Sequence, residues 1–283
     1  MEKLTQQYFK VYSSISPRLA SKKAFSVFQK VRMKEIRDRE RPFYEKAKHF
    51  KVKVQLNAIK QEKIDCYSLG HSSNPLVVLV HGWDSNAGSM AAIADSLVKE
   101  GYFTISFNLP GHAFYKSNST NLVECSTVFQ GVMEYLSPRK PEVIISHSFG
   151  SAVVAHGLSK MDTPIEKLIF LTNPNKIEDI FTAFKNHIGL SEKAYQHLIS
   201  HTEGLLNDSI KSLAVEENVK NVSVDQLLLI HDQEDKVLPY QNAEQVADAH
   251  PSAALITLEN VGHYRMLWND AVIQKCLQFI RIA

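Results

Sequence analysis

Six short apolar runs, separated by stretches with helical spacing, constrain the fold of this 283-residue chain more than any other feature. The runs are 76–80, 103–107, 143–145, 168–171, 227–230 and 255–258. Continuous apolar runs are typical of parallel strands that are buried on both faces by helices. Upstream, residues 49–56 alternate apolar and polar side chains, and 63–69 follow as a hairpin partner. The expected fold is therefore α/β, with an eight-stranded, mostly parallel sheet and helices on both faces.

Ser148 lies where the third of these runs meets a predicted helix. The strand-like residues 143–147 precede it, and a run of small residues follows it. A serine at the apex of a strand-turn-helix, with small residues two positions to either side, is typical of a nucleophile elbow. Here the small residues are Ser146 and Gly150. The commoner pattern has glycine in place of Ser146, so an ordinary connection that happens to carry a serine remains the alternative.

A serine hydroxyl needs a base within hydrogen-bond reach, and that base needs an orienting carboxylate. Candidates for both follow later strands. Asp232, Glu234 and Asp235 come directly after residues 227–230, and His263 comes after 255–258. With Ser148 they give the chain order Ser, Asp, His, which is the order in the α/β-hydrolase fold.

An oxyanion hole requires two preorganised N–H donors. Phe149, directly after Ser148, supplies the first candidate backbone N–H. The loop after residues 76–80 begins His81-Gly82-Trp83, and Gly82 allows the backbone to turn so that the Trp83 N–H points into the site. We therefore expect Trp83 and Phe149 to hold the oxyanion, with His81 and Gly82 as the supporting loop.

From about residue 50 to its end, the chain resembles the α/β-hydrolase family of serine hydrolases, which includes esterases and lipases. Five motifs in the family's order carry the resemblance: His81-Gly82-Trp83, Leu109-Pro110-Gly111-His112, Ser146-His147-Ser148-Phe149-Gly150, Asp235 four residues before Pro239, and Gly262-His263. The resemblance implies that Ser148 is the nucleophile, His263 the base and Asp235 its carboxylate partner. Asp232 stands where the family more often has glycine.

Other residues of these motifs have structural interpretations. His81 and His112 are expected to hold loops by hydrogen bonding, and His147 to shape the pocket. Asn108 and Ala113 depart from the family pattern, which bears on loop geometry more than on catalysis.

The implied activity is hydrolysis of a carboxylic ester or thioester through an acyl-enzyme on Ser148, with no metal or cofactor. The three catalytic side chains do not identify the acyl group, so a Ser-dependent carbon–carbon bond hydrolase or a peptidase stays open. A non-catalytic binding protein with the same fold is the alternative of a different class.

The segment between the fourth and fifth runs, about 174–222, is much longer than the other connections. Its apolar residues recur at helical spacing, which predicts a helical lid over the carboxyl edge of the sheet; an insertion away from the site is the alternative. Phe181, Phe184 and Leu198 in it favour an apolar acyl chain, although the same residues could pack the insertion onto the body.

The first 49 residues form a separate, basic and helical extension in this interpretation, and residues 50–283 form the hydrolase domain. Residues 1–63 hold 17 Lys or Arg against 6 Asp or Glu. Residues 18–37 read as one amphipathic helix, which either docks on the acidic remainder or makes peripheral contact with an anionic membrane. No recognition motif accompanies the charge, so we do not expect nucleic acid as a partner.

Composition adds expectations about the cellular environment. No apolar run approaches 18 residues, and the first ten residues lack the apolar core of a signal peptide, so a cytoplasmic protein is expected. The three cysteines are widely spaced and are expected to be reduced. No pattern predicts the oligomeric state.

Overall fold

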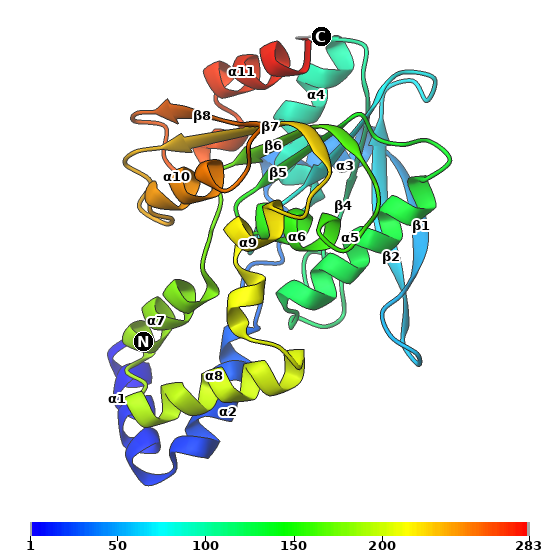
Figure 1. Ribbon diagram of the computed structural model, residues 1–283. Helices are drawn as coiled ribbons and strands as arrows, with labels where there is room; N and C mark the ends of the chain where they lie inside the picture. Colours follow the sequence, from blue (N-terminus) through cyan, green and yellow to red (C-terminus); the bar gives the residue numbers. More distant parts are fainter. Residues whose placement is uncertain (1, 282–283) are drawn as a thin grey trace.

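An eight-stranded sheet forms the centre of the computed structural model, which describes residues 2–281 (Figure 1). Met1, the first residue of the predicted extension 1–49, and residues 282–283, the last of the predicted domain 50–283, lie outside the described residues. The strands are β1 (Lys48–Gln55), β2 (Gln61–Leu69), β3 (Leu76–Val80), β4 (Phe103–Phe107), β5 (Val143–His147), β6 (Ile165–Leu171), β7 (Val224–Asp232) and β8 (Ala253–Leu258). Their order is β1-β2-β4-β3-β5-β6-β7-β8. β2 is antiparallel to β1 and β4, and the other neighbouring pairs are parallel, as predicted.

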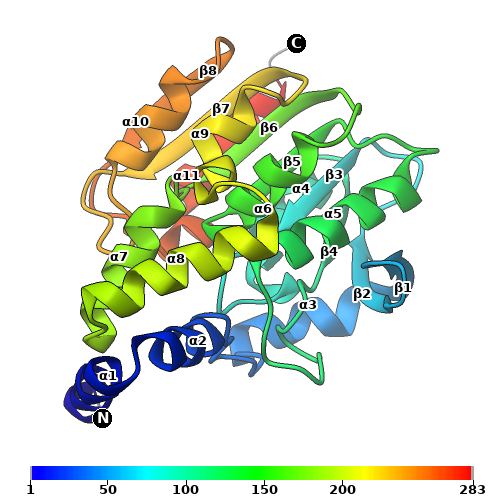
Figure 2. The ribbon, with the colours of Figure 1, turned by 60° about the horizontal axis from the view of Figure 1, so that its bottom comes forward.

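Helices cover both faces of this sheet (Figure 2). They are α3 (Arg41–Lys46), α4 (Ala91–Lys99), α5 (Leu122–Leu136), α6 (Phe149–Leu158), α9 (Val215–Val219), α10 (Gln241–Asp248) and α11 (Asp270–Arg281). Because successive strand side chains point to opposite faces, β3 contributes Val78 to the core under α5 and α6 and Val77 to the core under α4 and α11. Burial on both faces explains why the parallel strands are continuously apolar.

Four helices form a lobe beside the sheet, at the lower end of Figure 1. They are α1 (Glu2–Ile15), α2 (Pro17–Phe28), α7 (Ile177–Ile188) and α8 (Glu192–Leu206), and we call them the helical lobe. α7 and α8 belong to the predicted insertion, whereas α1 and α2 come from the N-terminal extension. An apolar seam joins the two pairs, and it contains Phe9, Ala20, Ala24, Phe181, Ile188, Leu190, Ala194 and Leu198.

The prediction of one helix over residues 18–37 is wrong at its C-terminal end, because α2 ends at Phe28. Beyond it, Lys30 forms an isolated bridge with Ser119, and the Val31 N–H donates to the Asn118 carbonyl. The Arg32 N–H donates to the Asp84 carboxylate at 2.7 Å. These partners replace the hydrogen bonds that a longer helix would have made within itself.

The rest of the N-terminal segment packs against the sheet domain. Phe43 is buried in the core that contains Tyr67 and Met90. The buried Glu40 carboxylate accepts a hydrogen bond from Asn86 at 2.8 Å. The segment after α2 therefore contributes to the same body as the sheet.

The structure bears on two expectations that came from composition, the state of the cysteines and the lack of a membrane-spanning helix. Cys66, Cys125 and Cys276 are free and buried. None of the helices in residues 2–281 combines the length and apolarity needed to cross a bilayer.

Candidate active site

Ser148 sits in a strained turn between β5 and α6. Its backbone has φ 53° and ψ −124°, a conformation that residues other than glycine rarely adopt. Its N–H donates to the Thr172 carbonyl at 2.9 Å. A Cβ on Gly150 would lie 2.6 Å from the backbone oxygens of Val80 and His81. Only glycine therefore lets α6 start this close to the end of β3, and the turn has the geometry of a nucleophile elbow.

Ser146 stands where glycine is commoner, and its hydroxyl forms a hydrogen bond inside the protein. Ser146 is fully buried, and its Oγ donates to the Ser151 Oγ at 3.1 Å. The buried hydroxyl thus has a partner within the first turn of α6, so the departure from the usual pattern leaves the elbow intact.

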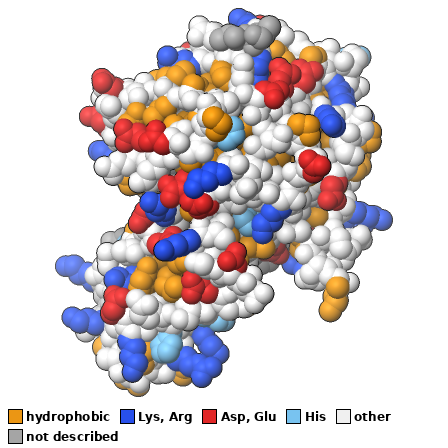
Figure 3. All heavy atoms as spheres, viewed as in Figure 1, with side chains coloured by type: hydrophobic (Ala, Val, Ile, Leu, Met, Phe, Trp, Pro, Cys, Tyr) orange, Lys and Arg blue, Asp and Glu red, His pale blue; other side chains and the backbone are white. Residues whose placement is uncertain are grey.

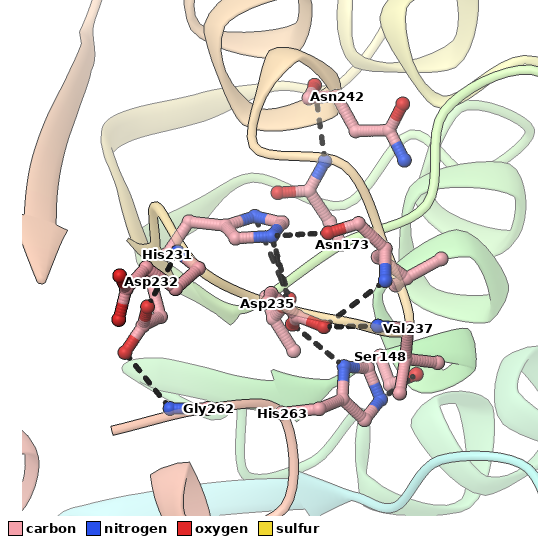
Figure 4. A network of polar contacts seen from close by, with 12 residues as sticks. Ser148, Asn173, His231, Asp232, Asp235, Val237, Asn242, Gly262 and His263 are labelled. Atoms are coloured by element: carbon pink, nitrogen blue, oxygen red, sulfur yellow. Dashed lines mark hydrogen bonds and ion pairs between the residues drawn. The ribbon is translucent and has the colours of Figure 1, made fainter. Parts of the chain in front are cut away.

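The structure brings together the three residues that the sequence singled out, from three separate strand ends (Figure 4). The Nε2 atom of His263 lies 3.0 Å from the Ser148 Oγ. On its other side, Nδ1 of His263 lies 2.8 Å from Oδ2 of Asp235. A hydroxyl, an imidazole and a carboxylate are therefore connected in series, which is the arrangement that activates a serine.

Four donors surround the Asp235 carboxylate. Val237 and Leu238 donate backbone N–H groups to Oδ1 at 2.7 and 3.0 Å, and Thr172 Oγ1 donates to Oδ2 at 2.9 Å. Burial by itself would raise the pKa of Asp235, but the hydrogen bond and charge of His263 and the two backbone donors hold this pKa well below its usual range. The carboxylate is therefore ionised and stabilises a positive charge on His263.

The two neighbouring acids are turned away from the histidine side chain. Asp232 is fully buried and accepts hydrogen bonds from the backbone N–H groups of Val261 and Gly262. It thereby fixes the loop that leads into His263. Glu234 is exposed, so of the three acids left open by the sequence only Asp235 reaches the imidazole.

The three histidines of the supporting motifs make hydrogen bonds to the backbone. His81 accepts from the Leu109 N–H on Nε2 at 3.0 Å and lies 2.7 Å from the Gly82 carbonyl through Nδ1, which ties two loops together. His112 contacts the Pro110 carbonyl at 2.8 Å. Nε2 of His147 donates to the His263 carbonyl at 3.0 Å. Burial, followed by the nearby His263, lowers the pKa of His147 to about 3, so His147 is a neutral positioning group.

The two predicted oxyanion donors lie beside the nucleophile. Phe149 is the first residue of α6, where backbone N–H groups have no partner within the helix. A Cβ on Gly82 would lie 3.1 Å from the Ser148 Cβ, so the loop that carries Trp83 passes directly over the serine. The rings of Trp83 and Phe149 meet edge to face at 5.0 Å.

A pocket of about 170 Å³ opens at Ser148. Its walls contain the aromatic side chains of Trp83, Tyr264 and Trp268 and the polar ones of Arg37, Asp84 and Ser85, together with His147, His263, Val237 and Leu267. None of the residues that line it belongs to the 174–222 insertion. The prediction that this insertion covers the site stays a prediction.

The apolar residues of the insertion have another partner. The Phe28 ring of α2 packs edge to face on Phe181 and Phe184 at 4.7 and 5.2 Å, and Leu198 is fully buried in the same seam. The inference from these residues to an apolar acyl chain is therefore not supported, because packing against the N-terminal helices accounts for them.

Comparison with known proteins agrees with this architecture. A family profile described as serine aminopeptidase, S33, matches residues 71–223, which is just over half of the chain. The chain belongs to the α/β-hydrolase family. A second profile of the family, described as TAP-like protein, matches residues 210–282. No curated protein matches the sequence.

Solved hydrolase structures share the fold of this α/β-hydrolase at low sequence identity. An esterase from Pyrococcus furiosus superposes with a TM-score of 0.66 and 17% identity, over 89% of this chain and 96% of its own. An esterase from Exiguobacterium antarcticum gives 0.60 and 17%, over 82% and 100%. A bacterial membrane phospholipase A gives 0.63 and 17%, over 86% and 89%. These similarities concern the fold, and they agree with the α/β-hydrolase profile.

The structure of this α/β-hydrolase adds site residues that the sequence analysis missed. Thr172, at φ 48°, both accepts the Ser148 N–H and donates to Asp235. Its signal was available, since it follows β6 at the same carboxyl edge of the sheet. Arg37 had none, because it lies in the N-terminal segment, which precedes the part of the chain that resembles the family.

The same segment supports one pocket wall. The Arg39 guanidinium lies 3.7 Å from the centre of the Trp268 ring. Glu40 accepts from the Arg37 backbone N–H and contacts its guanidinium at 3.3 Å. Residues 37–40 of the predicted extension therefore form part of the surroundings of the candidate active site.

Within residues 2–281, no group of three or more His, Cys, Asp or Glu side chains has the arrangement of a metal site.

Proposed function

We propose that this protein is a serine hydrolase that cleaves a small carboxylic ester or thioester through an acyl-enzyme on Ser148. The observation that carries the proposal is the series of contacts from Ser148 to His263 at 3.0 Å and from His263 to Asp235 at 2.8 Å. The strained backbone of Ser148 supports it, because evolution retains such conformations chiefly where function uses them.

In the proposed reaction His263 takes the Ser148 proton while Oγ attacks the acyl carbon. The developing oxyanion is held by the N–H groups of Phe149 and Trp83, and Asp235 stabilises the imidazolium. The imidazolium then gives its proton to the leaving alcohol or thiol, and the acyl-enzyme forms. A water deprotonated by His263 attacks it, and the acid product leaves as Ser148 regains its proton.

The pocket supports a small substrate. Its volume of about 170 Å³ is below the range of roughly 300–1,000 Å³ that is usual for sites of drug-sized ligands. The aromatic walls formed by Trp83, Tyr264 and Trp268 favour a short apolar group beside the reacting bond. We therefore expect acyl chains of a few carbons to be hydrolysed faster than long ones.

The test is hydrolysis of nitrophenyl esters of increasing acyl length by the wild type and by Ser148→Ala. We expect turnover by the wild type, with the highest kcat/KM for short acyl groups, and a loss of about 10⁴-fold or more in the variant. Ser96→Ala is the matched control, since it removes a hydroxyl on α4 that donates to the Ala92 carbonyl of its own helix and should retain most of the activity.

A covalent serine probe separates the possible failures. If no ester is hydrolysed but a fluorophosphonate still modifies Ser148, the site is active and the ester class is wrong. If the folded protein is neither active nor modified, the acyl-enzyme proposal fails and a non-catalytic binding role takes its place.

A peptidase is the second candidate, because the matching family profile is described as serine aminopeptidase. Asp84 lines the pocket and could pair with the ammonium group of a peptide N-terminus. Aminoacyl nitroanilides test this directly. Faster turnover of these amides than of the matching esters, together with its loss in Asp84→Asn, would favour the peptidase.

A further inference from the structure

Helix α1 presents an apolar stripe to its surroundings. Leu4, Tyr8, Val11 and Ile15 follow one another at spacings of four, three and four residues, so they lie on one face of the helix. Their exposed fractions lie between 50% and 77%. Leu19 at the start of α2, 52% exposed, follows the same spacing. Isolated exposed apolar residues are ordinary, but a continuous stripe of this kind marks an interaction surface.

The stripe is not the face by which α1 joins the helical lobe. Phe9 is buried in the apolar seam, Ser13 is buried as well, and Tyr12 is half-buried against the seam. Nε2 of Gln6 also donates to the His187 carbonyl at 3.0 Å. The internal packing of α1 is therefore satisfied without the stripe, which stays available for a partner.

A basic hollow borders the stripe. It has a volume of about 730 Å³ and is lined by Lys3, Gln6, Gln7, Lys10, Val11, Ser14, Asn186 and Gly189. Val11 belongs to both surfaces, so the apolar stripe and the lysines are contiguous. Both lysines are exposed.

The N-terminal segment that carries the stripe is positive. Residues 2–30 contain six Lys or Arg and one Glu. Lys3, Lys10, Arg18, Lys22, Lys23 and Lys30 are all exposed. On the face drawn in Figure 3, Lys and Arg side chains lie around the rim of the lower lobe.

We propose that the exposed face of α1 docks on an anionic phospholipid surface. Leu4, Val11 and Ile15 enter the boundary between headgroups and acyl chains, and Tyr8 lies at headgroup level with its hydroxyl in contact with water. Lys3 and Lys10 reach the lipid phosphates from the border of the stripe. This combination of apolar stripe and basic border is what an interfacial helix requires.

The charge favours a membrane over a second copy of the chain. Two copies packed stripe to stripe would bring two basic segments of the same composition together, and the like charges would oppose association. An anionic surface instead gains from the same residues. The contact lies on α1 and not on the predicted segment 18–37, because Phe25 and Phe28 of α2 pack into the seam of the lobe.

The experiment is sedimentation of the full chain with vesicles of phosphatidylcholine alone and with vesicles in which part of it is replaced by phosphatidylglycerol. We expect binding to the anionic vesicles and little binding to the neutral ones. Raising the salt concentration should weaken binding, because the lysines act through a screened field. The Ser148→Ala variant should bind as the wild type does, since docking is independent of hydrolysis.

Two pairs of variants locate the contact. Leu4→Ser/Val11→Ser/Ile15→Ser should lower the partition coefficient at least tenfold. Its control is Ile59→Ser/Tyr135→Ser/Leu205→Ser, which removes three exposed apolar side chains elsewhere.

The second pair of variants tests the charge. Lys3→Gln/Lys10→Gln should lower binding about fivefold for each lysine. Lys53→Gln/Lys63→Gln removes the same charge from an exposed pair on β1 and β2 and should change binding less.

Three results would overturn the proposal. The first is wild-type protein that stays in the supernatant with both kinds of vesicle. The second is equal binding by the α1 variants and their controls. The third is a concentration-dependent dimer that the serine variant of α1 dissociates, without binding to vesicles, which would assign the stripe to a second copy. Circular dichroism of each variant confirms that α1 stays folded.

Discussion

The candidate active site at the carboxyl edge of the sheet and the helical lobe are each stabilised by a different kind of interaction. At the edge, Ser148, Asp235 and His263 are fixed by short loops after strands, and directional hydrogen bonds set their orientation. In the lobe, two N-terminal helices and two helices from the middle of the chain meet through one apolar seam. Hydrogen bonds also cross between them: Nε2 of Gln6 donates to the His187 carbonyl at 3.0 Å, and the Ser191 N–H donates to the Ser13 Oγ at 3.4 Å.

This difference predicts two kinds of response to substitution. Polar contacts are worth little in net stability but define geometry, so changes at the edge should act mainly on rate. Apolar packing is not directional and supplies free energy, so changes in the seam should act mainly on stability. The following substitutions are ordered by the size of the effect expected.

Asp235→Asn should cause the largest loss. An amide at this position no longer stabilises the His263 cation or selects its tautomer, so we expect kcat to fall about 10⁴-fold. Because the amide is also a weaker acceptor for the backbone donors of Asp235, we expect the free energy of unfolding to fall by about 1–3 kcal/mol. Steady-state kinetics and thermal denaturation measure the two quantities.

Asp232→Asn is the matched change at the other buried acid. It weakens the acceptor for the Val261 and Gly262 N–H groups, so it should cost about 1–3 kcal/mol in stability and much less in kcat. Equal losses of kcat in the two variants, at unchanged stability, would show that position 235 does not hold the catalytic carboxylate.

Phe181→Ala should weaken the lobe by about 3–5 kcal/mol, because it leaves a cavity between Phe28 and the rest of the seam. Hydrogen exchange should quicken in α1, α2 and α8 and stay slow in the sheet, while kcat remains close to that of the wild type.

The control for this variant is Phe129→Ala, which removes the same side chain from the core under α5. It should quicken exchange across the sheet. Identical exchange patterns in the two variants would show that the lobe and the sheet unfold as one unit.

Acid should act on the sheet domain through buried histidines. Burial, followed by the charge of Lys160, lowers the pKa of His156 from 6.5 to about 4. Between these values the unfolded chain binds a proton that the folded chain does not, so stability is complete above pH 6.5 and falls as the pH drops towards 4.

His156→Leu removes this titration. Between pH 7 and pH 4 the wild type should therefore lose about 3 kcal/mol more than the variant. Denaturant unfolding at several pH values measures the difference. A steeper pH dependence in the variant than in the wild type would contradict the assignment.

Part of this structure could be predicted because local patterns carry it. The bounds of β3 and β4 coincide with the apolar runs 76–80 and 103–107, since burial on both faces leaves an unbroken apolar signature. The convergence of the proposed catalytic side chains could be predicted for a related reason. Parallel strands end at one edge of a sheet, so Asp235 and His263 converge on Ser148 whatever the length of chain between them.

The two residues that depart from the family pattern, Asn108 and Ala113, both lie in loops after strands. Asn108 accepts the Ala87 N–H at 2.9 Å through Oδ1 and so joins the loops after β3 and β4. Ala113 adopts φ 46°, where glycine would be free of strain.

The sequence by itself determined the sheet, the elbow and the three side chains that we propose to be catalytic, because each depends on residues that are neighbours along the chain or on strands with a shared edge. Only the tertiary structure decided where the basic N-terminal segment lies. Its amphipathic pattern was compatible with a membrane as well as with another part of the protein. The seam with α7 and α8 and the placement of Arg37 at the pocket arise from contacts between residues that are far apart in the chain, which no local pattern encodes.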